Sequence, residues 1–540
     1  MLGLPQTVQE GAAFTMHLRN SVYGGFVQDT YQATHNLTLT LGLRYEDITP
    51  RQDAVKNYNI NFDRLTGNPE VGFSYKNYLG IDNWQPRIGF AWQPGFAPQT
   101  VIRGGYGIST YMEGVGVNNM ADANPPNTVA HEVTYGGVNL PNFTLDQGYN
   151  SFPAAGCTLA GVESLSAACI SGATIHETAP NMQPAVNQQW NLMVQHQFGK
   201  NTTASLGYVG NKIDHMTDIY WYGQSVLNAN GTISPPPYSA ALFAAGAGAV
   251  RYNGSDAVSD YNAMEATLAT RDYRGLDAQA SYTWSKCMAN SLGYFGSYGD
   301  EEGTGEFQTI GQHNFFQNEY NPMGDYGKCI TDAAGDLNGY AVYALPFGHG
   351  KMFGSSVSKP VNEVIGGWQT ALDLTFRSGF ALQPAGPDDS GTTSVNPRPD
   401  CTAGVPINQK PTWEQIGGSF GLVTLNPNIA SAPATGTFGN CQNGIWRGPH
   451  LKTADLNLTK QFPITEQVNV AFQAQFVNLT NTPVFSLPAA WPGTFSDCDA
   501  CNGIRTTGPT GGLGGTVGTF GMEDGSNPGR FVDLSLKLNF

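Results

Sequence analysis

The chain ends in Val532-Asp-Leu-Ser-Leu-Lys-Leu-Asn-Phe540, where apolar and polar residues alternate without a break. Because successive side chains of a strand point to opposite faces, this stretch predicts a β-strand with one apolar and one polar face. The same alternation recurs in residues 37–45, 276–284 and 468–476. Its repetition along the chain predicts an all-β fold.

Thirteen segments carry this pattern and are predicted as strands. They lie at residues 21–32, 36–47, 84–93, 99–113, 186–198, 201–214, 261–271, 274–286, 335–346, 366–382, 451–461, 465–480 and 530–540. The connections between them are alternately short (33–35, 94–98, 199–200, 272–273, 347–365, 462–464) and long (48–83, 114–185, 215–260, 287–334, 383–450, 481–529). Bacterial outer-membrane barrels have short periplasmic turns and long extracellular loops. The sequence therefore predicts a transmembrane antiparallel β-barrel with its C-terminus in the periplasm.

The low content of charged residues indicates that part of the protein surface does not face water. Charged residues make up 13% of the 540 residues, against roughly 25% in soluble globular proteins. No segment approaches the roughly 18 consecutive apolar residues of a spanning helix, which excludes helical membrane insertion. A barrel avoids such runs because its lipid face uses every second residue. The net charge of −16 argues against a nucleic-acid partner.

The eight cysteines fall two to a long connection. The pairs are Cys157 with Cys169, Cys287 with Cys329, Cys401 with Cys441, and Cys498 with Cys501. An oxidising compartment and pairing within each connection explain this distribution, so we predict four disulfides. Cys498-Asp-Ala-Cys501 also has the spacing of a redox or metal motif, but no second ligand pair accompanies it, and a disulfide is favoured.

No motif indicates catalysis or a cofactor. The chain has neither a Gly-x-Ser-x-Gly elbow nor a His-Glu-x-x-His pair, and its nine histidines are scattered. The acidic stretch 300–306 offers oxygen ligands for Ca²⁺, yet it lacks the EF-hand spacing, so a solvated loop is favoured. Glycine-rich residues 511–515 are followed by no Lys-Ser/Thr and are interpreted as a flexible loop rather than a phosphate cradle. We expect no enzymatic activity.

Two sets of side chains are candidates for contact with a solute. Charged residues on the polar face would line a channel or hold a plug, with simple wall lining favoured, and these are Arg44, Glu46, Asp277, Asp373, Arg377, Asp455, Asp533 and Lys537. Aromatic residues in the long connections are possible ligand contacts, and these are Tyr220, Trp221, Tyr222, Trp413, Trp446 and Trp491. Aromatics near strand ends are instead expected to form the girdle at the headgroup level.

Thirteen strands do not close a barrel, because bacterial single-chain barrels have even strand numbers and every strand edge must be paired in lipid. We therefore expect residues 1–540 to be one partial barrel, with further strands N-terminal to Met1. The first residues show no basic and apolar signal-peptide pattern, which fits the same expectation.

Several segments, in their order along the chain, resemble strands of TonB-dependent outer-membrane receptors, in particular their Oar-like branch. The first two are Gly25-Phe-Val-Gln-Asp-Thr-Tyr31 and Asn36-Leu-Thr-Leu-Thr-Leu-Gly-Leu-Arg-Tyr-Glu46. Similar segments follow at Pro86–Trp92, Arg103–Ile108, Gln189–Leu192, Tyr261–Met264, Ala280–Lys286 and the terminal Phe540. The resemblance covers nearly the whole chain at the strands, and the long connections match no motif.

This resemblance implies a 22-stranded barrel of which the chain supplies about the last thirteen strands. It also implies a missing N-terminal plug whose short box contacts a TonB-type energy-transducing protein of the inner membrane. The final strand, with Leu534, Leu536, Leu538 and Phe540, is expected to be the one that the barrel-assembly machinery binds. The implied location is the bacterial outer membrane, with its lipid as a further partner.

The expected function is uptake of an unidentified solute, bound by the extracellular loops and passed through the lumen. A siderophore, an oligosaccharide and a peptide remain open as substrates. The alternative is a surface adhesion or structural barrel without transport. A third interpretation, a soluble secreted β-sandwich lectin, would remain in the aqueous phase without detergent.

Overall fold

The computed structural model describes residues 7–13, 17–50, 52–54, 59–73, 83–111, 124–134, 157–291, 316–382, 384, 386–416, 419–448, 450–465, 468–482, 522–523 and 529–540. Strands dominate it, and the fold is all-β. None of the helices in these ranges has the length and apolar character needed to cross a membrane.

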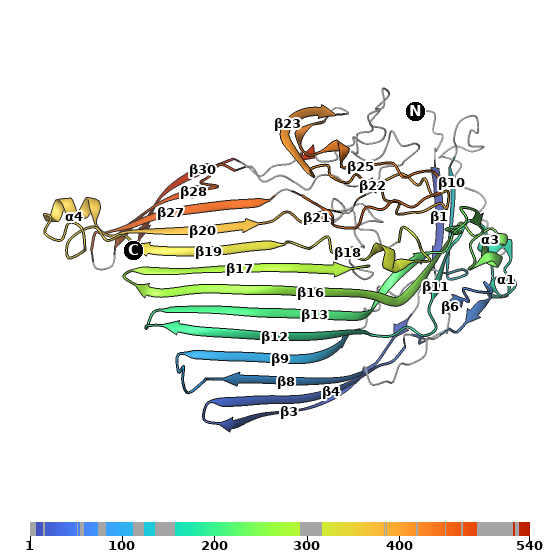
Figure 1. Ribbon diagram of the computed structural model, residues 1–540, viewed down its shortest axis with the longest axis horizontal. Coiled ribbons are helices and arrows are strands. Elements are labelled where there is room, and N and C mark those ends of the chain that lie inside the picture. The colour runs from blue at the N-terminus through green and yellow to red at the C-terminus, as the bar shows by residue number, and fades with distance from the viewer. Residues whose placement is uncertain are drawn as a thin grey trace.

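One large antiparallel sheet forms the body of the molecule, and we call its main path of thirteen strands the wall (Figure 1). Each strand pairs with the next one along this path. In order, the strands are β3 (Val22–Thr34), β4 (Leu37–Ile48), β8 (Trp84–Trp92), β9 (Thr100–Tyr111), β12 (Ala185–Phe198), β13 (Thr202–Trp221), β16 (Ala249–Tyr273), β17 (Leu276–Ala289), β19 (Gly335–Ala344), β20 (Trp368–Arg377), β27 (Leu451–Pro463), β28 (Asn469–Val477) and β30 (Phe531–Asn539). Each overlaps one of the segments predicted from alternation.

The register gathers the apolar side chains of neighbouring strands on one face. Leu534, Leu536 and Leu538 lie opposite Ala474, Phe472 and Val470 of β28. The three leucines are 65%, 73% and 55% exposed, and Phe540 is exposed as well. Directly paired residues of an antiparallel sheet point to the same side, so these rows form a continuous apolar face. The opposite face of the wall is polar.

The two ends of the wall differ, as Figure 1 shows. The short turns and the C-terminus lie at one end, whereas the long connections gather at the other. Gly199 and Gly275 have positive φ angles in two of the short turns, where a residue without a Cβ is least strained. The longest short-side connection contains helix α4 (Lys359–Ile365). This arrangement agrees with the alternation of short and long connections predicted from the sequence.

The remaining elements lie in the long connections and, for β1 and β2, in the segment before β3. The strands are β1 (Thr7–Ala13), β2 (Leu18–Arg19), β5 (Gln52–Asp53), β6 (Ile60–Phe62), β7 (Pro69–Val71), β10 (Thr128–Thr134), β11 (Thr174–Thr178), β14 (Val226–Leu227), β15 (Ile233–Ser234), β18 (Gly327–Lys328), β21 (Ala381–Leu382), β22 (Asp400–Cys401), β23 (Asn408–Ile416), β24 (Ser419–Leu425), β25 (Ala430–Ser431), β26 (Trp446–Arg447) and β29 (Met522–Glu523). The helices are α1 (Leu159–Glu163), α2 (Ala167–Ile170), α3 (Ala240–Ala244), η6 (Pro322–Asp325) and η7 (Pro427–Ile429).

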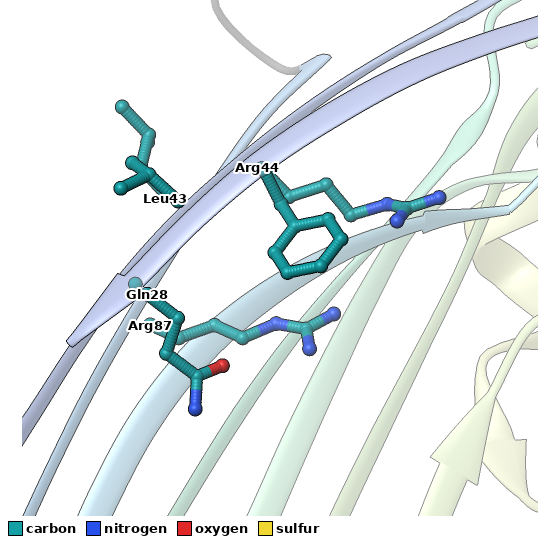
Figure 2. Close-up of a pocket in the computed structure, with 7 residues that line it drawn as sticks. Gln28, Leu43, Arg44 and Arg87 are labelled. Atoms are coloured by element: carbon teal, nitrogen blue, oxygen red, sulfur yellow. The ribbon is translucent and has the colours of Figure 1, made fainter. Parts of the chain in front are cut away.

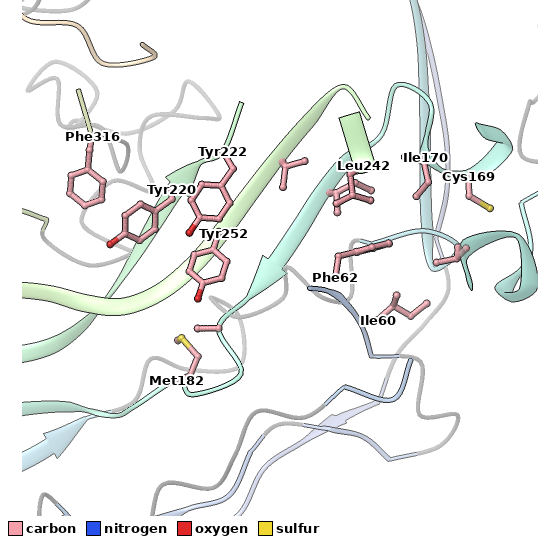
Figure 3. Close-up of a cluster of buried hydrophobic side chains, with 14 residues drawn as sticks. Ile60, Phe62, Cys169, Ile170, Met182, Tyr220, Tyr222, Leu242, Tyr252 and Phe316 are labelled. Carbon is pink, nitrogen blue, oxygen red and sulfur yellow. The ribbon is translucent and has the colours of Figure 1, made fainter. Parts of the chain in front are cut away.

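These connections bury a hydrophobic cluster of their own, which we call the cap core (Figure 3). Its members come from separate connections and from the ends of β13 and β16. They are Ile60, Phe62, Val162, Cys169, Ile170, Ile175, Ala179, Met182, Tyr220, Tyr222, Leu242, Val250, Tyr252 and Phe316. The connections therefore fold as a packed layer at one end of the wall.

Three of the predicted cysteine pairs form disulfides, although Cys287 lies at the end of β17 rather than in the connection that follows it. Cys157 pairs with Cys169, Cys287 with Cys329, and Cys401 with Cys441, at Cα–Cα distances of 4.7, 5.4 and 5.0 Å. Cys498 and Cys501 lie outside the described residues. The first disulfide holds α2 next to the segment before α1, beside the cap core.

The predicted boundaries were wrong in two regions of the chain. Strands β13 and β16 extend to Trp221 and from Ala249, although residues 215–260 were predicted as a connection. The predicted strand 366–382 is divided into β20 and the separate short strand β21. In the described part of the chain the wall runs from β3 to β30, and no pairing joins these two strands.

Candidate functional site

A cavity of about 440 Å³ lies where the extended ends of β13 and β16 meet the long connections. We call it the tyrosine pocket because five tyrosines line it. They are Tyr220, Tyr222, Tyr238, Tyr252 and Tyr320, joined by Arg64, His215, Asp256 and Glu319. The pocket borders the cap core, which supplies three of the tyrosines.

The strand geometry explains why these rings gather. Tyr220 and Tyr222 are two residues apart on one extended segment and point to the same side. Tyr252 pairs directly with Tyr220 across the β13–β16 ladder. The rings of Tyr222 and Tyr252 are stacked with centroids 5.0 Å apart, and that of Tyr238 lies 4.7 Å from Tyr222. Figure 3 shows Tyr220, Tyr222 and Tyr252 side by side.

Arg64 provides the cation of the pocket. Its guanidinium carbon lies 5.2 Å from the ring centroid of Tyr238 and 5.1 Å from that of Tyr252, within the range of cation–π attraction. Its Nη1 also donates to the hydroxyl of Tyr222 at 3.4 Å. Arg64, an exposed residue of the connection between β4 and β8, therefore contacts three rings that come from β16 and from the connection between β13 and β16.

Two carboxyl groups lie within hydrogen-bond distance of the Tyr220 hydroxyl. The Tyr220 hydroxyl is 2.8 Å from Asp256 Oδ1 and 3.2 Å from Asp218 Oδ2. Because a hydroxyl carries one proton, it donates to one of these two acceptors at a time. Glu319 is buried beside them, and burial raises the pKa of its carboxyl well above the usual value, partly offset by N–H groups of Trp221 and Phe316.

A second buried acid, Glu177 of β11, lies close to the same rings. The Ser239 hydroxyl donates to Glu177 Oε1 at 2.7 Å, and Oε2 has no hydrogen-bond partner among the described atoms. Burial raises the pKa of Glu177 to about 8, so this carboxyl is mostly neutral at pH 7. Glu177 lies behind the rings rather than in the lining, whereas the buried Glu319 and the exposed Asp256 line the pocket itself.

The arrangement of these groups is suited to binding. Aromatic faces contact apolar ring faces or cations, while hydroxyl, carboxyl and guanidinium groups fix the orientation of a polar solute. In the described residues, no three His, Cys, Asp or Glu side chains are placed to hold a metal ion.

The structure brings only part of the predicted aromatic set together. Tyr220 and Tyr222 line the pocket, but Tyr220 and Trp221 belong to β13 rather than to a loop. Trp446, in β26, is 2% exposed and packs in a second buried cluster, so its assignment as an accessible ligand contact was wrong. The backbone of Trp413 lies in β23. Trp491 lies outside the described residues.

Sequence reasoning missed Arg64, Tyr238, Tyr252 and Tyr320. These residues are separated by up to 256 positions and share no motif, so no local signal links them. The only signal was the density of tyrosine between residues 220 and 252, where four of them occur.

The polar face of the wall forms a second group of interacting side chains. Arg44 Nη2 is 2.6 Å from Glu46 Oε1, and Gln85 Nε2 donates to Glu46 Oε2 at 3.1 Å and to Thr110 Oγ1 at 2.7 Å. Figure 2 shows Arg44 and Arg87 extending from one side of the sheet and Leu43 from the other. The predicted polar-face residues Asp373 and Asp455 pair directly across β20 and β27.

Comparison with known proteins gives a family and several structural neighbours. Residues 1–510 match the family model described as the outer membrane beta barrel domain. The chain is similar to the copper transporter OprC (11% identity, 96% of this chain, 47% of that one, TM-score 0.40). It is also similar to the outer membrane transporter YddB from Escherichia coli (12% identity, 97% of this chain, 54% of that one, TM-score 0.39). A further similar structure is the FrpB iron transporter from Neisseria meningitidis (10% identity, 98% of this chain, 45% of that one, TM-score 0.40).

The chain spans about half the length of these three transporters. No curated protein matches it.

Proposed function

Since the chain belongs to the outer membrane beta-barrel domain family and lies in the bacterial outer membrane, we propose that it is the wall and cap of a barrel that takes up a solute. The tyrosine pocket is the site that captures this solute. The long connections face the outside of the cell, and the short turns with the C-terminus face the periplasm. The polar face of the wall lines the passage.

The observation that carries the proposal is the position of the pocket. It lies at the end of the wall where the long connections gather, and it combines stacked tyrosines, one arginine and several carboxyl groups. Such a mixture of ring faces and a few directed polar groups is typical of sites for small molecules. A purely structural cap would have no need for an open cavity lined by charged side chains.

The remaining features follow the resemblance to Oar-like TonB-dependent receptors. The chain is the C-terminal part of such a receptor, and residues 1–540 supply thirteen of its 22 strands. Further strands pair with β3 and β30, each of which has one wall neighbour among the described residues, since an unpaired edge is unfavourable in lipid. The missing part holds the plug, through which a TonB-type protein supplies energy. The barrel-assembly machinery binds β30, and no cofactor takes part.

Binding to the full chain in detergent micelles tests the capture site. The probes are a linear glucose oligosaccharide, a ferric catecholate siderophore and a lysine tripeptide, titrated calorimetrically. We expect one of them to bind and Tyr252→Ala to weaken its binding about tenfold or more, since a central aromatic contact is commonly worth above 1 kcal/mol. Tyr273→Ala is the matched control, because Tyr273 is an exposed tyrosine at the end of β16 by the short turns.

Two outcomes would overturn the proposal. In one, a probe binds equally well to the Tyr252 and Tyr273 variants. In the other, none of the probes binds while cells that carry the protein attach to a surface through it, which is the behaviour of an adhesion barrel.

A further inference from the structure

A second cavity, of about 520 Å³, opens on the opposite face of the wall from the polar face. We call it the lysine pocket because Lys286 and Lys328 line it together with Arg447. Its floor contains Tyr208, Met264 and Trp284, which lie in one row across β13, β16 and β17. The tyrosine pocket and the lysine pocket share no lining residue.

The floor of the lysine pocket continues the apolar face of the wall. Trp284 is 62% exposed, and Tyr282, two residues along β17, is exposed on the same side. Lys286 follows Trp284 at the same two-residue spacing, and Lys328 pairs with Met288, the next position on that side. The two lysines therefore extend the apolar row toward the long connections.

The pocket has more positive charge than its acid can balance. Among the described lining residues Asp332 is the only acid, and it is already engaged. Its carboxylate accepts from the Cys287 N–H at 2.7 Å and forms an ion pair with Arg447. The Arg447 Nη1 also donates to the carbonyls of Asp332 and Gly379 at 2.8 and 3.0 Å. Arg447 is thus fixed in place, and two lysines remain beside it.

The fold holds these cations together. The Cys287–Cys329 disulfide ties the end of β17 to β18, one residue away from each lysine. Burial and the positive charges of Arg447 and Lys286 lower the pKa of Lys328, despite the opposite effect of Asp332. An anion bound between the three cations would relieve this repulsion.

We infer that the lysine pocket binds the phosphorylated headgroup of a lipid in the outer leaflet of the outer membrane. Lysine and arginine donate charge-assisted hydrogen bonds to phosphate oxygens. Tryptophan and tyrosine, the residue types of Trp284 and Tyr208 in the pocket floor, are enriched where membrane proteins meet lipid headgroups. A floor that continues the apolar face fits a ligand whose phosphate is attached to acyl chains. The inference rests on the proposed orientation of the wall and is independent of solute uptake.

Equilibrium binding of bisphosphorylated lipid A to the full chain in mixed detergent micelles tests the inference. We expect Lys286→Gln with Lys328→Gln to weaken binding at least about tenfold, because two charge-assisted hydrogen bonds are lost. The control is Lys351→Gln with Lys359→Gln, which removes the same charge at the short-turn end and should leave the affinity unchanged. Trp284→Ala should weaken binding with no change in charge.

The other arms separate a lipid from a free anion. Dephosphorylated lipid A should bind no better to the native chain than to the double lysine variant. Inorganic phosphate at millimolar concentration should compete weakly. The inference is overturned if the two double variants bind lipid A equally, or if inorganic phosphate displaces lipid A completely. The β-sheet circular dichroism of the same variants should be unchanged, which shows that the chain is folded whether or not the tyrosine pocket binds a solute.

Discussion

The wall and the cap core place the same residue types in opposite environments. Leu534, Leu536 and Leu538 of the wall are more than half exposed, whereas Ile60 and Leu242 of the cap core are 0% exposed. In the wall, the apolar solvent is the lipid outside the protein, so side chains turn outward. In the cap, which faces water, the hydrophobic effect drives them inward. Apolar side chains therefore face outward in the wall and inward in the cap, and β13 and β16 extend from one environment into the other.

The largest expected effect concerns the cap core. Leu242→Ala should destabilise the cap by about 2–5 kcal/mol, since Leu242 is fully buried and its truncation leaves a cavity. Limited proteolysis of the long connections in the detergent-folded chain would measure this loss, while the β-sheet circular dichroism of the wall should remain. Leu65→Ala is the control, because Leu65 is an exposed residue of the same layer and its loss should have little effect. Equal sensitivity of both variants would mean that the cap is not packed.

A charge placed on the wall tests the opposite rule. Leu372 lies midway along β20 in register with the apolar face, and Ala371 lies beside it on the polar face. Leu372→Arg should cost about 2–4 kcal/mol of unfolding free energy in bilayers, as arginine does on the lipid side at the midplane. Ala371→Arg should cost far less, because it points into the water-filled side. If urea titrations in vesicles gave equal losses, the assignment of the two faces would be wrong.

The wall was predictable from the sequence because lipid contact forces strict alternation. Residues 37–45 show the period directly, and β4 covers them. The prediction of strands failed where the side chains no longer need to alternate between lipid and water. The β13–β16 ladder shifts register between Ile213, Met216 and Asp218, and His215 has a positive φ angle, so the alternation slips and Tyr220 was assigned to a loop. The tyrosine pocket was not predictable, because its residues are collected from several connections by tertiary packing.

The titration of the buried carboxyl group of Glu177 provides a third test, with a smaller expected effect. Burial raises the folded-state pKa of Glu177 from 4.5 to about 8. Between these two values the folded cap binds one proton more than the unfolded cap, so its stability falls as pH rises. The slope is at most about 1.4 kcal/mol per pH unit. Hydrogen exchange of the cap amides between pH 6 and pH 7 should show this fall.

Glu177→Gln keeps the shape of the side chain and removes the titration. After correction for intrinsic chemistry, its cap should lose less stability between pH 6 and pH 7 than the native cap does, because the contribution of Glu177 is gone while that of the buried Glu319 remains. A native cap with the same pH dependence as the Glu177→Gln cap would show that the Glu177 carboxyl is ionised, rather than neutral, when folded.

The smallest effect separates the stability of the cap from its binding function. Tyr222→Phe keeps the stacked ring and removes only the acceptor for Arg64 Nη1, a contact of 3.4 Å to an exposed side chain. The expected loss in cap stability is about 0.5 kcal/mol, the low end for a hydrogen bond, and proteolysis of the cap should barely change. The hydroxyl nevertheless lines the tyrosine pocket, so the calorimetric affinity for the bound probe should fall more clearly than the stability does. If both quantities changed in proportion, the ring cluster would be a part of the cap core that holds the layer together and nothing more.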